Sequence, residues 1–454
     1  MSAVYQLVLA GGGFVSLFVM WRLLRVAGTS VISLRPFFLF SVYYFFIHFL
    51  TPLYKYRVER YRYQTDYEDT TLVINALLVF FAYAIAYLLS EKFHRPRTLQ
   101  AQSKLLHAQG SKEAIIVGLT IYFIGFVFSA TTADFIVNRV GTVAFLSDRI
   151  ANSADLGIGQ HFSNFLITGS TIFFAGWLTT NRRTWAFGVT ASTAMFAYSY
   201  FYFGLLSSRN SILILIIFHI AVFCLYRPTP IHNSKKALAY GLLALTAISS
   251  TLTLGYQTTV ARYAYSDNQY AQRQLEDIWH TLLDGSFGND ENLLWLIENN
   301  NEYYYGLTYL AAVTNLVPSS IWPDKPLGAG PKIKNAIYPG SYVRGAEYNS
   351  SITTGLLTEG WMNFGVTGLF LSIFAWAAIT GWFIQRVGML LSVGSQTIYM
   401  LGSISLSTAL IYSEFLGFLG RFIFLIVLPL LIVKVLRFLV STTKKRRPFN
   451  RKHH

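Results

Sequence analysis

Long apolar segments recur along the chain, and one long polar stretch, residues 256–352, interrupts them late in the sequence. A helix that crosses the hydrocarbon core of a bilayer, about 30 Å thick, needs roughly 20 apolar residues. We therefore expect an all-α polytopic membrane protein with about 11 transmembrane helices and a long external loop. The expected spans are residues 3–21, 31–53, 70–90, 113–131, 161–180, 184–206, 211–226, 237–255, 353–384, 392–413 and 418–438.

The polar stretch divides the chain into three regions. Residues 1–255 hold the first eight expected helices, residues 256–352 form the large loop, and residues 353–454 hold three helices and a basic tail. Hydrophobic residues make up 53% of the chain and charged residues 13%, a composition that excludes an ordinary soluble globular protein. The lipid bilayer is thus the first partner that we expect.

The distribution of Lys and Arg predicts the orientation of the helices, because cytoplasmic loops hold an excess of these residues. Basic residues gather within 92–112, at 182–183 and in the tail after Val433. On that side lie only Glu91 and Glu113 of the 21 acidic residues. We therefore expect a cytoplasmic C-terminus, with the long loop on the opposite side of the membrane.

Two other function classes lack support in the sequence. The net charge of +15 could suggest nucleic acid, but the Lys/Arg clusters lie at helix ends, where they meet anionic headgroups, so we expect no nucleic-acid partner. No Gly-rich phosphate-binding signature of nucleotide enzymes is present, and we expect no cofactor. The single cysteine, Cys224, lies in an apolar span, which leaves the external loop without a disulfide.

The long loop contains an amphipathic segment and a rigid aromatic one. Residues 271–283 place apolar side chains at i, i+3, i+4, i+7 and i+8, which predicts an interfacial helix resting on lipid. Further on, the segment V-P-S-S-I-W-P-D-K-P, residues 317–326, has three prolines and must form a rigid turn. The aromatic residues Tyr304, Tyr305 and Trp322 could stack on sugar rings, or they could belong to a membrane-interface belt.

Three stretches carry a resemblance to a known family. The run from Gly306, closing in V-P-S-S-I-W-P-D-K-P, is similar to a Gly-led apolar run that ends in Pro-x-x-x-Trp-Pro-x-x-Pro. The segment T-G-L-L-T-E-G-W-M-N-F-G-V-T-G, residues 354–368, and the segment L-L-S-S-R-N-S-I, residues 205–212, resemble two of its helix junctions. The family is that of the Wzy-type oligosaccharide repeat-unit polymerases, which include O-antigen and enterobacterial common antigen polymerases.

The resemblance implies a fold, a location and a set of partners. The fold would be of the glycosyltransferase C type, in the bacterial inner membrane with the large loop in the periplasm. The substrates would be oligosaccharides linked to undecaprenyl diphosphate, and a chain-length regulator and a flippase of the same pathway would be partners.

The implied reaction transfers a growing glycan from polyprenyl diphosphate to a hydroxyl of an incoming repeat unit, with inversion expected at the anomeric carbon. It requires a base for the acceptor proton and positive charge for the departing diphosphate. Arginine suits the second role because its planar fork binds phosphate oxygens. Arg209, at an external helix junction, is the first candidate, and we also expect it to act in catalysis; the alternative is that it only contacts lipid headgroups.

Further candidates for both roles follow from their position in the chain. Arg262, Arg344 and Arg421 are second-rank diphosphate ligands. Glu347 and Glu359 are candidates for the base. Glu359 interrupts an apolar helical stretch, so a buried structural role is the alternative for it.

The acidic residues Asp66, Glu68 and Asp69 lie in the first external loop. Oxygen ligands at this spacing could bind Mg²⁺ or Mn²⁺. The polymerases that the chain resembles do not need a metal, and charged surface loops are common, so we expect no metal site here.

Two other functions remain as alternatives. An O-antigen ligase-like glycan transferase would share the donor half of the reaction. A lipid-linked oligosaccharide flippase or other transporter would show repeated intramembrane charges or inverted symmetry, and neither is evident in the sequence.

Overall fold

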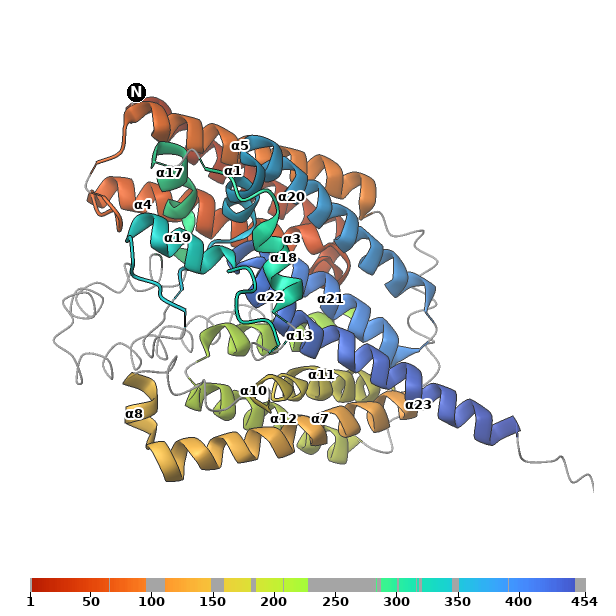
Figure 1. The fold of residues 1–454 in the computed structure, drawn as a ribbon. Helices are drawn as coiled ribbons and strands as arrows, with labels where there is room; N and C mark the ends of the chain where they lie inside the picture. The colour runs from red at the N-terminus through yellow and green to blue at the C-terminus, as the bar shows by residue number, and fades with distance from the viewer. Residues whose placement is uncertain are drawn as a thin grey trace, which may run out of the picture.

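The computed structural model describes residues 2–64, 66–94, 111–147, 159–180, 185–206, 208–227, 283, 287–299, 302–315, 317, 321–344, 351–390 and 392–445. Every element assigned in these residues is a helix, which confirms the all-α prediction for these residues. The long helices lie alongside one another (Figure 1). The N-terminal end of α1 (Ser2–Ala27) lies at one end of the bundle, and α23 (Leu428–Lys445) leaves at the other.

Six helical stretches in the described residues are long and apolar enough to cross a membrane. They are Ala3–Ala27, Pro36–Val58, Asp69–Phe93, Ser111–Val140, Leu356–Val387 and Phe415–Arg437. By length and composition the chain is therefore a helical membrane protein. The expected span 237–255 lies outside the described residues, and α11 (Phe165–Leu178) is only about 21 Å long, shorter than a hydrocarbon core of about 30 Å. The count of eleven spans and their orientation stay predictions.

The N-terminal region contains a long helical rod with a change of helix type in its middle. The elements of the N-terminal region are α1, η1 (Gly28–Ser30), α2 (Val31–Leu34), α3 (Pro36–Tyr44), the π-helix η2 (Phe45–Leu50), α4 (Thr51–Val58) and α5 (Asp69–Phe93). The rod consists of α3, η2 and α4. Pro52 has no N–H to donate, so an unbroken α-helix that passed through it would lose one backbone hydrogen bond. The wider turn of η2 precedes this proline, and the Thr51 hydroxyl donates to the Phe46 carbonyl at 2.7 Å. The rod therefore continues to Glu59, whose left-handed φ of 52° ends α4.

The central region is held together by glycine contacts between α7 and α11. Its elements are α7 (Ser111–Asp134), the π-helix η3 (Phe135–Val140), α8 (Thr142–Ser147), α10 (Gly159–Phe162), α11, α12 (Trp185–Leu205) and α13 (Arg209–Tyr226). A Cβ on Gly118 of α7 would lie 2.5 Å from the Phe173 nitrogen, and one on Gly125 would lie 2.7 Å from the Leu166 nitrogen. Small residues at such positions let two helix backbones approach closely, which favours packing in lipid.

The described residues of the long polar stretch contain three helices. These are α17 (Asp290–Asn299), α18 (Leu307–Thr314) and α19 (Ala329–Ile337). The expected amphipathic helix 271–283 lies outside the described residues except for Leu283, which is buried. In Figure 1, α17 and α19 lie at the same end of the bundle as the start of α1. Two of the described helices of the polar stretch, α17 and α19, therefore lie at one end of the long helices.

The C-terminal region begins with a helix that folds back on itself. Its elements are α20 (Leu356–Met389), α21 (Val393–Tyr412), α22 (Phe415–Phe422), the π-helix η5 (Ile423–Val427) and α23. Within α20, Phe364 and Gly365 leave helical geometry, and Gly365 has a φ of 60°. A Cβ on Gly360 would lie 2.6 Å from the Gly368 oxygen, although eight residues of a straight helix span about 12 Å. Residues 356–363 are thus a short helix packed against the start of the long arm.

Helix α21 lies at the centre of the fold. Every residue from Val393 to Ile411 is buried, including several Ser and Thr side chains. Several hydroxyls of this helix donate to carbonyls about one turn earlier, as where Ser407 donates to the Ser403 carbonyl and Thr408 to the Ile404 carbonyl, both at 2.9 Å. A helix with these polar side chains can therefore be buried on all sides.

The contact of α7 with α11 gives a testable prediction. Replacing Gly118 by Ala should destabilise the protein by about 1–3 kcal/mol, because the added methyl group forces two backbones apart. The matched control is Gly11→Ala in α1, where a Cβ would meet nothing within 4 Å. Because Ala is the better helix former by about 1 kcal/mol, the control should be neutral or stabilising. Thermal unfolding of the two variants in detergent measures the difference, and equal midpoints would contradict the packing described here.

Candidate functional site

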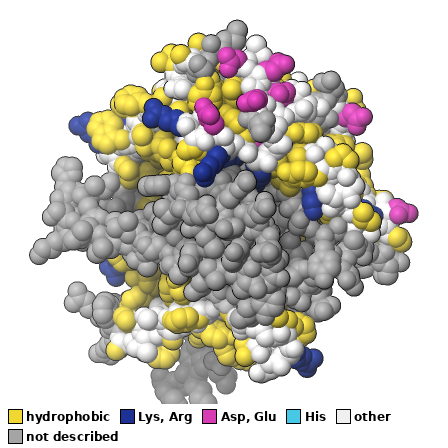
Figure 2. All heavy atoms as spheres, turned by 90° about the vertical axis from the view of Figure 1, so that its left-hand side faces the viewer, with side chains coloured by type: hydrophobic (Ala, Val, Ile, Leu, Met, Phe, Trp, Pro, Cys, Tyr) yellow, Lys and Arg dark blue, Asp and Glu magenta, His cyan; other side chains and the backbone are white. Residues whose placement is uncertain are grey.

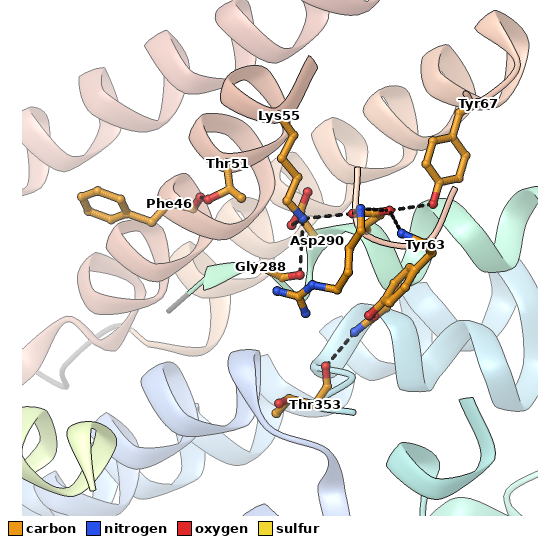
Figure 3. Close-up of polar contacts among 11 residues, drawn as sticks. Phe46, Thr51, Lys55, Tyr63, Tyr67, Gly288, Asp290 and Thr353 are labelled. Carbon is orange, nitrogen blue, oxygen red and sulfur yellow. Dashed lines mark hydrogen bonds and ion pairs between the residues drawn. The ribbon is translucent and has the colours of Figure 1, made fainter. Parts of the chain in front are cut away.

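A buried ionic cluster joins α4 to α17 of the long polar stretch. The ammonium of Lys55, from α4, lies 2.9 Å from Asp290 Oδ1 and 3.2 Å from Glu291 Oε2, both in the first turn of α17. Lys55 is 1% exposed, Asp290 7% and Glu291 1%. We call these three residues the Lys55 cluster; Figure 3 shows Lys55 pointing toward Asp290.

The second carboxylate of the cluster is held by the loop that follows α4. Glu291 accepts hydrogen bonds from the backbone N–H groups of Arg62 and Tyr63, at 2.8 and 2.9 Å, and from the Tyr67 hydroxyl at 3.0 Å. Its position at the N-terminus of α17 adds the favourable end of the helix dipole. A buried carboxylate is costly unless its oxygens find donors, and Glu291 finds them on two sides.

The same loop, residues 59–68, follows α17 to its other end. Gln64 donates to the Glu298 carboxylate at 2.9 Å, and Asn299 donates to the side-chain oxygen of Gln64 at 3.3 Å. Asn292 accepts from the Tyr63 hydroxyl at 2.6 Å and donates to the Thr353 carbonyl at 2.6 Å. The loop thus fixes α17 along its whole length, and Asn292 ties the helix to the segment just before α20.

A second polar junction surrounds Glu359. Its carboxylate accepts from the Thr308 hydroxyl at 2.8 Å and from the Phe415 N–H at 2.6 Å, so it joins α18 to the N-terminus of α22. Asn363, one turn later, accepts from the Gly306 N–H at 2.9 Å and donates to Thr308 at 2.7 Å. Glu359 is 2% exposed. In this arrangement it holds three segments together and has little access to solvent.

Glu414, which immediately precedes α22, has a similar structural role. Its carboxylate accepts from the backbone N–H of Gly330 at 2.6 Å, in the first turn of α19. Burial raises the pKa of the Glu414 carboxyl, and this hydrogen bond opposes that rise. Helix α19 is therefore fixed at its N-terminus by the C-terminal region of the chain.

Between α17 and α19 lies an open pocket of about 420 Å³. Its lining residues are Trp295, Asn299, Glu302, Tyr304, Leu327, Lys332, Asn335 and Ala336. The Lys332 ammonium lies 3.8 Å from the centre of the Tyr304 ring. Burial lowers the pKa of Lys332, and burial together with the charge of Glu302 raises the pKa of Tyr304. Two aromatic side chains together with charged and amide groups form a lining that can bind a small polar ligand.

The face of the protein at this end is marked by acidic side chains. Asp and Glu residues gather on the upper half of the view in Figure 2, which looks at the end of the bundle where α17 and α19 lie. The exposed acidic residues of residues 59–69 and of the pocket lining are Glu59, Asp66, Glu68, Asp69 and Glu302.

The aromatic candidates are separated by the structure. Tyr304 lines the pocket, whereas Tyr305 is 75% exposed and Trp322 is 42% exposed, outside the pocket lining. The arginine Arg344 donates to the carbonyls of Pro323 and Lys325 and so stabilises the proline-rich turn. Its guanidinium is therefore already engaged in holding this segment.

The structure places only some of the remaining candidates. Arg209 is the first residue of α13, and Arg421 lies half-buried in α22. Arg262 and Glu347 lie outside the described residues. Their roles, and that of Arg209 as diphosphate ligand, stay predictions.

The structure adds residues that the sequence analysis did not single out. Lys55, Asp290 and Glu291 form the cluster, and Trp295 and Lys332 line the pocket. A signal was present for some of them: Lys55 closely follows an apolar span, and an acidic pair before an apolar run is typical of a helix start. Lys332 carried no such signal, because its neighbour Tyr304 is distant in sequence.

The side chains of Asp66, Glu68 and Asp69 do not gather around a common point. Among the described residues, no three His, Cys, Asp or Glu side chains lie together as a metal site would need. The backbone N–H of Glu68 instead donates to the Glu298 carboxylate at 3.1 Å.

Comparison of the chain with protein-family models, with curated protein sequences and with solved structures finds no match. The case for a function therefore rests on the residues and their geometry.

The Lys55 cluster yields the next prediction. Lys55→Met should lower the free energy of unfolding by about 3–5 kcal/mol, because two buried carboxylates lose their counter-ion. The surface variant Lys434→Met, on an exposed position of α23, should leave thermal unfolding unchanged. Adding Asp290→Asn to Lys55→Met should recover some of the loss, since Glu291 keeps its backbone donors. Absence of any recovery in the double variant would show that packing, and not charge, explains the effect.

The junction at Glu359 can be tested separately. Glu359→Gln keeps the shape of the side chain but replaces one acceptor oxygen by an amide group, so the Thr308 or the Phe415 donor loses its partner. We expect a loss of about 1–3 kcal/mol in stability, measured by thermal unfolding. Asp324→Asn, an exposed change in the proline-rich turn, is the control. A Glu359→Gln protein as stable as the wild type but inactive would instead favour the role of base.

Proposed function

We propose that the chain is a membrane glycosyltransferase of the Wzy type, which polymerises oligosaccharide repeat units carried on undecaprenyl diphosphate. The observation that carries this proposal is the pocket between α17 and α19, with aromatic, amide and charged groups at one end of a helical membrane bundle. The Trp-Pro segment that carries the family resemblance leads directly into α19. The Trp-Pro segment and one wall of the pocket are thus adjacent in the chain.

The chemistry needs a lipid-linked substrate to meet polar groups at the membrane surface. An acceptor hydroxyl attacks the anomeric carbon of the donor glycan, the bond from that carbon to the diphosphate oxygen breaks, and the diphosphate leaves with the electron pair. The acceptor proton passes to a base. A site at the end of membrane-spanning helices allows the polyprenyl chain to stay in lipid while the sugars lie in water.

The roles of individual residues follow from this scheme. Arg209, at the start of α13, and Arg421, in α22, are the proposed ligands of the departing diphosphate. Arg344 is less suited to that role because its guanidinium already binds two carbonyls of the proline-rich turn. Glu359 as base would have to exchange its two present donors for the acceptor, so Glu347 is the stronger candidate for the base.

The experiment that tests the proposal uses the purified chain in nanodiscs with a defined undecaprenyl-diphosphate repeat unit. We expect a ladder of products that differ by one repeat unit, formed equally with and without EDTA. Arg209→Ala should slow formation about 100-fold or more, as loss of a charge-stabilising donor does in other enzymes. Arg386→Ala, an exposed arginine near the end of α20, should keep the wild-type rate.

The other outcomes distinguish the alternatives. Transfer of a preformed polymer to a different acceptor, without growth of the ladder, would favour a ligase. Movement of the lipid-linked unit across the bilayer without any transfer would favour a flippase. If the Arg209→Ala variant is present in the membrane at the wild-type amount and still forms a normal ladder, Arg209 does not bind the diphosphate.

A further inference from the structure

We infer that the pocket between α17 and α19 binds one uncharged sugar residue of the glycan and does not bind the lipid diphosphate. The inference rests on the proposed function for the identity of the glycan, but the pocket itself is defined by its own residues. These come from three segments: Trp295 and Asn299 of α17, Glu302 and Tyr304 of the segment before α18, and Lys332 and Asn335 of α19.

The aromatic groups of the pocket supply an apolar wall. The Lys332 ammonium covers the ring of Tyr304 at 3.8 Å, a distance typical of a cation–π contact. Trp295, half-buried in the second turn of α17, is therefore the residue available for stacking on a sugar ring. Large rigid aromatic side chains bind at low entropic cost because they have few rotatable bonds.

The polar groups of the pocket include both donors and acceptors. The side chain of Lys332 makes no hydrogen bond or ion pair with the residues that the structure describes, so its ammonium, which lies over the Tyr304 ring, can also donate to a ligand. The amide nitrogen of Asn299 donates to the Trp295 carbonyl and to Gln64, at 3.1 and 3.3 Å, which leaves its oxygen as an acceptor. Sugar hydroxyls both donate and accept, so a mixed set of this kind suits them.

The charges in the pocket argue against a diphosphate. Among the described residues, its lining holds one cation, Lys332, and one carboxylate, Glu302, so their formal charges cancel. A diphosphate is bound by several arginines or lysines, and a carboxylate in the lining would repel it. The diphosphate must therefore bind elsewhere, and a neutral sugar fits this pocket better than an acidic one.

Both walls of the pocket are fixed before a ligand arrives. The Lys55 cluster and residues 59–68 hold α17, and Glu414 holds the N-terminus of α19. Asn335 is fixed as well, because it donates to the Tyr342 carbonyl and accepts from the Tyr342 N–H, at 3.0 and 2.8 Å. A preformed site loses less of its binding free energy to the ordering of side chains. A volume of about 420 Å³ lies within the usual range for small-ligand pockets, about 300–1,000 Å³.

The test measures binding apart from catalysis. Saturation-transfer NMR on the full chain in nanodiscs would use methyl glycosides of glucose, galactose, mannose and N-acetylglucosamine, with methyl glucuronide and inorganic pyrophosphate for comparison. We expect at least one neutral glycoside to bind and pyrophosphate not to displace it. Trp295→Leu and Lys332→Met should each weaken that binding about tenfold or more, whereas Trp21→Leu, on an exposed position of α1, should not.

Two kinds of result would overturn the inference: displacement of the glycoside by pyrophosphate, or tighter binding of the glucuronide than of every neutral glycoside. Absence of binding by all neutral glycosides would also overturn it. Because Lys332 is only half-buried, its variant provides the comparison if Trp295→Leu fails to fold.

The ladder assay separates this inference from the proposed function. Glycoside binding without any ladder would support the sugar-binding pocket and contradict the polymerase function. A ladder that forms at the wild-type rate in both pocket variants, with no glycoside binding, would support the polymerase function and contradict sugar binding in the pocket.

Discussion

A charge buried away from water needs a partner, and in this protein that requirement joins segments more than 200 residues apart. Lys55 lies at the end of a long apolar helix and is nearly inaccessible, so its ammonium is tolerated only beside Asp290 and Glu291. Because Glu291 also accepts hydrogen bonds from the backbone of residues 62 and 63, the loop, the helix α17 and the membrane-length stretch that contains α4 are fixed together. The position of the pocket depends on this arrangement, since α17 forms one of its walls.

The polar junction at Glu359 and Glu414 also depends on buried carboxylates that need partners, but here the partners are backbone N–H groups. Glu359 and Glu414 each accept a backbone N–H at the start of a helix, α22 in one case and α19 in the other. Helix N-termini leave such N–H groups without partners inside the helix, and a carboxylate satisfies them. The folded-back start of α20 brings Glu359 to this place. Helices α18 and α19 of the long polar stretch are therefore attached to the C-terminal helices, without a disulfide in the described residues.

This construction suits the function that we propose, the transfer of a lipid-linked glycan. The long helices supply an apolar surface, whereas α17 and α19 present polar groups at one end of the bundle. The described lining of the pocket is balanced in charge, and the two arginines proposed for the diphosphate, Arg209 and Arg421, lie in other elements, α13 and α22. Separate places for sugar and diphosphate would let one site hold the glycan while the bond to the lipid breaks.

The sequence by itself determined the apolar helices, because a run of about 20 apolar residues can satisfy its backbone in lipid only as a helix. It also identified Tyr304 and Glu359 as unusual, one in an aromatic run and the other in an apolar helix. Only the tertiary structure decided their neighbours. Lys332 meets Tyr304, Asp290 meets Lys55 and Glu359 meets the start of α22 through contacts distant in sequence. No local pattern contains such contacts, because they depend on how the chain folds back at Gly365 and how the helices pack.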